Sequence, residues 1–219
     1  KPAEMLFDLE ADPHETKNLA ESAEYADKLI SMRNALVDKM KEINDLSLFP
    51  ENEMLRRALP VATTFGVKQN QQISQLIDLN QLALLPFDKA KPHLRRVIKS
   101  NNPLKQYWAW NISACFGTND RQLRHAANAL DNSTPVFVRL RAFEYLGICG
   151  EEVAERLVSL LYESTSNAEA AMILNTIVFL RDGGFSGSVN NLRIDPSQIK
   201  VDEPLVQRRL EYLGFVEIK

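Results

Sequence analysis

The sequence has few glycines, cysteines and histidines. Among its 219 residues there are 8 glycines, 2 cysteines and 3 histidines. The cysteines, Cys115 and Cys149, cannot build a disulfide framework, and neither lies in a CxxC pair or in a cysteine and histidine cluster with metal-binding spacing. We therefore expect both to be reduced, buried thiols.

Segments and charges that would direct a chain to a membrane or to nucleic acid are also missing. No apolar run is long enough to cross a bilayer, and the N-terminus lacks the order of charged, apolar and small residues that marks a signal peptide. The formal net charge is -3, from 26 basic and 29 acidic residues, so no general attraction to a polyanion is expected. Any binding to a polyanion must therefore be local.

The abundant residues indicate a helical chain. Hydrophobic residues make up 45% of the sequence, which is ample for a core, and Leu, Ala, Glu, Lys and Gln are common. From about Ser22 to Asn44, apolar residues recur at spacings of three and four, which predicts a long helix with one apolar face. That face consists of Tyr25, Leu29, Met32, Leu36, Met40 and Ile43. We expect an all-α or nearly all-α fold.

The first residues follow a different pattern. Met5, Phe7 and Leu9 stand at alternate positions, which is the period of a short half-buried strand, and Asp12-Pro13 predicts a turn after it. The sequence starts at Lys1 without a methionine and runs directly into this strand. We therefore expect the chain to begin in the middle of a longer protein.

Residues 46–66 separate this region from the rest of the chain. They contain Pro50 and Pro60 and keep no helical period, so we expect a crossing segment with one helical turn. The sequence thus divides into a first part, residues 1–67, and a second part, residues 68–219.

Helices and short turns alternate throughout the second part. Sliding the sequence on itself by 33 residues superposes Gly117, Gly150 and Gly183, and it also superposes Leu140 and Ile173 in a core column. Each glycine suits the positive-φ position at the end of a helix. The predicted helices cover residues 71–85, 88–99, 103–116, 120–131, 136–149, 153–163, 168–182 and 203–213, and the last of them is expected to cap the stack.

The repeat is most similar to short HEAT-like repeats. Thr134-Pro135 also occurs in ankyrin units, but Val136-Phe137 stands where ankyrin has Leu-His, and the tetratricopeptide pattern does not fit either. Val138-Arg139, followed by Ala142 and Leu146-Gly147, resembles the HEAT-like pattern. We expect an α-α superhelix of HEAT-like helix pairs in residues 68–219.

Residues 5–19, MLFDLEADPHETKNL, resemble the C-terminal signature of formylglycine-dependent sulfatases, with Phe7 in place of the usual tyrosine. In that family the motif implies the last strand and turn of a small C-terminal subdomain, followed by a helix that packs on it. Residues 44–54 are similar to the continuation found in bacterial sulfatases of the heparan N-sulfatase-like branch, and residues 105–110 to the opening of the repeats that follow in some of them. The resemblance implies that residues 1–67 are the C-terminal tail of a sulfatase domain.

What the resemblance implies for the whole protein is a sulfatase that hydrolyses sulfate esters or sulfamates of sulfated glycans with a formylglycine and a calcium ion, in the periplasm or outside the cell. Within it, this chain would be a non-catalytic part that shapes or covers the rim of the catalytic domain of the same polypeptide. The alternative is a stand-alone HEAT-like scaffold that binds another protein. Neither interpretation includes nucleic acid or a membrane segment.

No catalytic or metal site is expected in this chain. Neither Cys115 nor Cys149 lies in the Cys-x-Pro/Ala-x-Arg motif that yields formylglycine, and the histidines at positions 14, 93 and 125 have no nucleophile beside them in motif context. Asp8, Asp12 and Glu15 are close enough to raise the question of calcium. An aspartate before proline is more often a turn residue, so we expect a turn there.

Some basic and aromatic residues are candidates for contact with a sulfated glycan or another partner. They are Arg95, Arg96, Lys99, Lys105 and Trp108. An arginine fork suits sulfate oxygens, and an aromatic ring can stack on a sugar. Tyr107 and Trp110 share a helical face that is expected to enter the core, and Trp108 is expected to pack on the sulfatase-like tail. Arg139 is expected to pair with Asp131 or with a neighbouring carbonyl.

Overall fold

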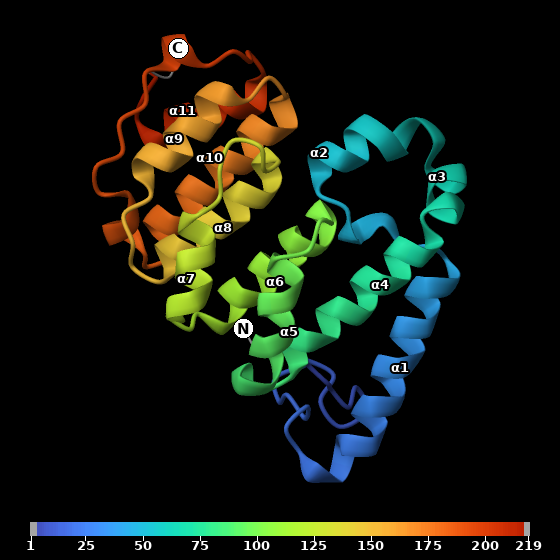
Figure 1. Cartoon of the computed structure of the whole chain (residues 1–219). Coiled ribbons are helices and arrows are strands. Elements are labelled where there is room, and N and C mark those ends of the chain that lie inside the picture. Colours follow the sequence, from blue (N-terminus) through green and yellow to red (C-terminus); the bar gives the residue numbers. More distant parts are fainter. Residues whose placement is uncertain (1–3, 217–219) are drawn as a thin grey trace.

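The computed structural model describes residues 4–216, and all regular structure in this part of the chain is helical (Figure 1). The α-helices are α1 (Ala26–Glu42), α2 (Glu51–Glu53), α3 (Ala62–Lys68), α4 (Asn70–Asn80), α5 (Phe87–Ile98), α6 (Pro103–Phe116), α7 (Arg121–Asn128), α8 (Val136–Ile148), α9 (Ala154–Glu163), α10 (Asn167–Asp182) and α11 (Pro204–Leu213). Short 3-10 helices cover Ala23–Tyr25, Leu46–Leu48, Leu59–Val61, Gln81–Leu84, Ser186–Val189 and Pro196–Gln198, and a π-helix covers Met54–Ala58. The predicted nearly all-α fold class is confirmed.

Capping residues explain why the helices of the second part lie close to their predicted bounds. The side chain of Asn102 accepts a hydrogen bond from the backbone N–H of Lys105 at the start of α6. At the start of α7, the side chain of Asp120 accepts from two backbone N–H groups. Gly117 and Gly214 end α6 and α11 in the left-handed conformation. These local signals mark where α6 and α7 begin and where α6 and α11 end.

The predicted glycine register holds for the first two units and shifts by one residue in the third. Gly150 has a φ of 87°, as expected, and Leu140 and Ile173 are buried, with 1% and 0% of their surface exposed. Gly183 has a φ of -85°, and the left-handed residue is Gly184, with a φ of 94°. Helix α10 has 16 residues, against 13 in α8, so its end falls later than a strict 33-residue period predicts.

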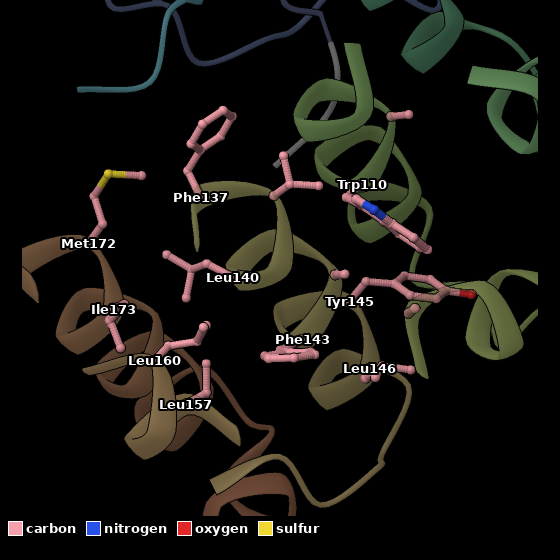
Figure 2. Close-up of a cluster of buried hydrophobic side chains, with 14 of the residues drawn as sticks. Trp110, Phe137, Leu140, Phe143, Tyr145, Leu146, Leu157, Leu160, Met172 and Ile173 are labelled. Atoms are coloured by element: carbon pink, nitrogen blue, oxygen red, sulfur yellow. The ribbon is translucent and has the colours of Figure 1, made fainter. Parts of the chain in front are cut away.

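From α4 onward the helices pack in two rows. Helices α4, α6, α8 and α10 each contact the next one in this order, whereas α5 packs on α6, α7 on α8, and α9 on both α8 and α10. Figure 2 shows the side chains of α6, α8, α9 and α10 that converge between the rows. Trp110 and Tyr145 are fully buried, and the centroids of their rings lie 5.6 Å apart. Burial of each such large side chain contributes about 1.5–3 kcal/mol to stability.

The crossing segment is more helical than its prolines suggested. Residues 51–68 form an almost continuous helical path through α2, the π-helix, a 3-10 helix and α3. The prediction of a single turn is therefore wrong. Pro50 is the N-cap of α2, and Pro60 lies at the start of a 3-10 helix. At these positions a helix does not need the backbone N–H that proline lacks.

The strand predicted for residues 5–9 does not form within residues 4–216. The N–H of Leu6 donates to Oδ1 of Asn18 over 2.9 Å, and the N–H of Leu19 donates to the carbonyl of Leu6 over 2.7 Å. The predicted inward face is also wrong, because Met5 and Leu9 are 58% and 60% exposed while Leu6 is buried. A strand needs a partner for its backbone groups, and here a polar side chain and a loop supply the partners instead.

Helix α1 lies within the predicted range of residues 22–44 but is shorter, because Ala23–Tyr25 form a 3-10 helix, and it buries no residue. The guanidinium of Arg33 holds the carboxylate of Glu4 by two hydrogen bonds of 2.7 and 2.5 Å, and Lys41 reaches Asp78 of α4 over 2.6 Å. Of its predicted apolar face, Met40 packs partly against the core. Met32, Leu36 and Ile43 are exposed. Much of this face therefore has no partner within residues 4–216.

Replacing Gly150 by alanine should destabilise the chain by about 1 kcal/mol, because an L side chain at its positive φ is strained. Gly187 provides a matched control. An added Cβ meets nothing within 4 Å at either position, and Gly187 has no positive φ. Chemical denaturation should therefore show Gly187→Ala to be neutral or slightly stabilising. Equal stability of the two variants would contradict the predicted role of the left-handed position.

Candidate functional site

A groove of about 890 Å³ lies between α5 and α7. Its walls carry several basic side chains, and its floor is apolar. The residues that line it are Arg95, Ile98, Lys99, Arg121, Gln122, Leu123, His125, Ala126, Ala129 and Leu130. No acidic side chain is among them.

The buried carboxylate of Asp120 fixes the two walls of this groove. Arg95 on α5 donates to its two oxygens from Nη2 over 3.0 and 2.9 Å, and Nζ of Lys91 lies 3.0 Å from Oδ2. The same carboxylate accepts the backbone N–H groups of Gln122 and Leu123 and thereby caps α7. Burial by itself would raise the pKa of this carboxyl. The N–H of Leu123 and the cations Arg95 and Lys91 outweigh burial and hold the pKa well below its ordinary value.

Several cations of the groove have no acidic partner. The charge of Arg95 is balanced by Asp120. Within residues 4–216, Lys99 and Arg121 form no ion pair, and the ring of His125 makes no hydrogen bond. The groove is therefore an electropositive patch on a chain whose formal net charge is -3.

The floor between these cations is apolar. Ile98 and Leu123 are buried and belong to the core, and Ala126 and Leu130 pack partly against the same core. Since these side chains are held from behind, the floor is preformed. A preformed apolar floor beside cations suits an anionic ligand that also presents an apolar face.

The structure brings together two of the five residues proposed from the sequence. Arg95 and Lys99 line the groove, whereas Arg96 and Lys105 do not. Nη2 of Arg96 lies 3.2 Å from Nδ1 of His93 on the exposed side of α5. Arg96 and Lys105 are therefore no longer candidates for this site.

Sequence reasoning missed Arg121 and His125, which supply the opposite wall of the groove. They lie on the helix that follows α6, about one helix pair beyond Arg95 in the sequence. The signal that could have found them is the spacing of four residues between them, which places both on one face of α7.

Trp108 has a structural role. Its Nε1 donates to the carbonyl of Leu48 over 2.7 Å, which confirms the predicted packing on the first part of the chain. Arg139 is also structural, as predicted. Its Nε donates to the carbonyl of Thr134 over 3.0 Å, and its Nη2 binds Glu163, not Asp131, over 2.6 Å.

No group of three or more His, Cys, Asp or Glu side chains in residues 4–216 could hold a metal ion. Asp12 accepts the N–H of Lys17 over 2.7 Å and the hydroxyl of Thr16 over 3.0 Å, which is the turn expected there. Both cysteines are unpaired, but Cys115 is exposed and not buried as predicted. Burial raises the pKa of the Cys149 thiol, which disfavours a nucleophilic thiolate.

No helix among residues 4–216 combines the length and the apolar character that a membrane span requires.

Comparison with known proteins links part of the chain to a sulfatase. The chain is 36% identical over 74 residues to an ulvan-active sulfatase of Formosa agariphila. The match covers 34% of this chain and 12% of the length of that protein. No family model matches the chain, and no solved structure matches it. One segment of the chain is thus similar to a sulfatase that is much longer than the matched region.

Replacing Asp120 by asparagine should destabilise the chain by about 1–3 kcal/mol at pH 7, because Arg95 and Lys91 lose a buried anion. Asparagine still caps a helix, so Asp120→Ala should cost about 1 kcal/mol more. Chemical denaturation of wild type, Asp120→Asn and Asp120→Ala measures the free energy lost with the buried anion and that lost with the helix cap. Asp195→Asn is a control, because that aspartate is exposed and its carboxylate bonds only Ser197 and Gln198.

The effect of Asp120→Asn should depend on pH. The folded-state pKa of Asp120 lies below the value of about 3.9 for a free aspartate, so the carboxylate stabilises the fold fully above about pH 5. Its contribution is lost progressively as the pH falls toward the folded-state pKa. The stability difference between wild type and variant should therefore be smaller at pH 3 than at pH 7. An equal difference at both values would contradict this account.

Proposed function

We propose that this chain is a non-catalytic accessory part of a sulfatase, attached to the catalytic domain of the same polypeptide. The similarity over 74 residues to the ulvan-active sulfatase supports this function, as does the sulfatase-like pattern of residues 5–19. The structural observation that carries it is the exposed apolar surface of residues 4–67. A stand-alone HEAT-like scaffold is the alternative.

Most of the large hydrophobic residues that are exposed in residues 4–216 precede residue 68. They are Met5, Leu9, Ile30, Met32, Leu36, Ile43, Leu55, Leu59, Val61 and Val67. Extensive exposed apolar surface is unfavourable in water and commonly marks an interface. The segment that carries the sulfatase-like pattern contributes to this surface.

A groove of about 360 Å³ lies within this surface, between residues 6–10 and the first turns of α1. Apolar side chains that line it include Leu9, Tyr25 and Met32. The occupant that we propose for this apolar surface is the sulfatase domain. Residues 5–9 and α1 would then gain the apolar partners that they lack within this chain.

The second part would be a HEAT-like repeat domain over residues 68–219. The two rows of helices from α4 to α10 support this proposal, and α11 would act as the capping helix because it packs on α10. Such a rigid array could cover or shape the rim of the catalytic site. We further propose that the parent enzyme belongs to the heparan N-sulfatase-like branch, works in the periplasm or outside the cell, uses formylglycine and calcium, and acts on a sulfated glycan.

The isolated chain should not hydrolyse aryl sulfates or sugar sulfates, with or without calcium. The longer polypeptide should contain Cys-x-Pro/Ala-x-Arg and should release sulfate. Sulfate release measured side by side on both proteins tests this expectation. Calcium-dependent turnover by the isolated chain would refute the non-catalytic role, and a reading frame without the motif would refute the sulfatase assignment.

Replacing Met32 and Leu36 together by aspartate should destabilise the longer polypeptide, because burial of each side chain against the sulfatase domain contributes about 1.5–3 kcal/mol. In the isolated chain these side chains are 51% and 61% exposed. The same variant should there change the unfolding free energy by less than about 0.5 kcal/mol per site. Thermal unfolding of the wild type and the variant, each as longer polypeptide and as isolated chain, measures this difference in destabilisation.

Ser31 and Asn34 provide the matched control, since both are exposed polar residues on the same helix. Their replacement by aspartate should leave both proteins unchanged. If the Met32 and Leu36 variant left the longer polypeptide as stable as wild type, the sulfatase domain would not be the occupant of this surface. Self-association of the isolated chain that this variant abolished would favour the scaffold instead.

A further inference from the structure

We propose that the groove between α5 and α7 binds a short sulfated oligosaccharide. This inference deepens the proposed function, because the ligand class rests on the link to a sulfatase. The binding site itself rests on the groove, its cations and its apolar floor.

The uncompensated charges select an anion. Lys99, which directly follows α5, and Arg121 of α7 line the same groove, and no acidic residue lines it. The planar guanidinium of Arg121 can donate two parallel hydrogen bonds to sulfate oxygens, and Lys99 adds a mobile point charge. Arg95 is held by Asp120, so it forms part of the wall and is not needed as a free ligand.

The floor and the size of the groove favour a ligand that is larger than a simple anion and has an apolar face. About 890 Å³ lies within the range of sites that hold ligands of several hundred daltons, whereas inorganic sulfate is far smaller. Ala126, Ala129 and Leu130 are not fully buried and form an apolar surface on which the C–H face of a sugar ring can lie, with Ile98 and Leu123 buried behind it. Gln122 adds a side-chain amide that can bond a hydroxyl group. A sugar chain of a few units with sulfate groups matches all three features.

The lining also argues against nucleic acid as the ligand. No Phe, Tyr or Trp side chain lines the groove, so it lacks the large aromatic platforms on which successive bases stack. The chain as a whole has a formal net charge of -3, which repels a long polyanion outside the groove. A short ligand with its charges gathered within the groove avoids this repulsion.

The test uses isothermal titration calorimetry of the 219-residue chain with a heparin tetrasaccharide at low salt. Binding should weaken as salt is added, because part of the attraction is electrostatic. The chemically desulfated tetrasaccharide should bind at least about tenfold more weakly, a loss of about 1.4 kcal/mol. Sodium sulfate at the same sulfate concentration should not compete, since it cannot use the floor.

Two variants separate charge from shape. Lys99→Glu with Arg121→Glu should lower the affinity for the tetrasaccharide at least about tenfold. Ala129→Phe leaves the charge unchanged but fills the groove from its edge, and it should also lower the affinity. The matched control is Lys200→Glu with Arg208→Glu, which makes the same change of net charge at exposed residues that do not line the groove. This control should bind within about threefold of wild type. Thermal unfolding confirms that each variant is folded.

Equal losses in both double variants would overturn the proposal, because binding would then depend on net charge and not on the groove. Tighter binding of an acidic peptide or a single-stranded RNA of equal charge would overturn the ligand class. Absence of tetrasaccharide binding by wild type would also overturn it. The proposed function would survive these results, since its tests measure sulfate release and the α1 surface and do not involve the groove.

Discussion

The carboxylate of Asp120 is the interaction on which the geometry of the second part depends most directly. It joins α5 to α7 through Arg95 and Lys91 and caps α7 with the same oxygens. The backbone N–H of Asp120 lies 3.3 Å from the hydroxyl of Tyr145, which in turn donates to the carbonyl of Thr118 over 2.9 Å. One turn of chain thereby ties three helices together. An unpaired carboxylate at this depth would be unfavourable, so Asp120 can be buried here only because these donors surround it.

The two parts of the chain differ in how completely they bury their apolar side chains. In the second part the helix rows bury a continuous core in which Trp110, Leu140 and Leu157 are almost inaccessible to water. In the first part α1 buries none of its residues, although it carries a clear apolar face. Hydrophobic burial is the main favourable contribution to folding, so a long helix without it needs a partner elsewhere. The second part thus buries most of its apolar residues within the chain, whereas the apolar face of α1 stays largely uncovered within residues 4–216.

Much of the second part could be predicted because its signals are local. Asn102 and Gly117 mark the ends of α6 in the sequence itself, and the 33-residue period places Leu140 and Ile173 in the core. The choice of Leu6 over Met5 and Leu9 as the buried residue could not be predicted, because it depends on Asn18 and Leu19 and not on alternation. Local periodicity specifies an apolar face, but tertiary contacts decide how it is used. The groove escaped prediction for the same reason, since its walls belong to helices separated by α6.

Grooves occur at more than one place along the helix rows, and they differ in the charged residues that line them. A second groove, of about 310 Å³, lies beside α9 and is lined in part by Arg139, Arg156, Glu155 and Glu163. There the guanidinium of Arg139 is neutralised by Glu163 at 2.6 Å. Cations and carboxylates balance in that groove, so it has no excess charge to attract an anion. In the groove between α5 and α7, Asp120 neutralises only the inner cations, and Lys99 and Arg121 remain uncompensated. The placement of acidic residues, more than the packing of helices, therefore decides which groove can hold an anion.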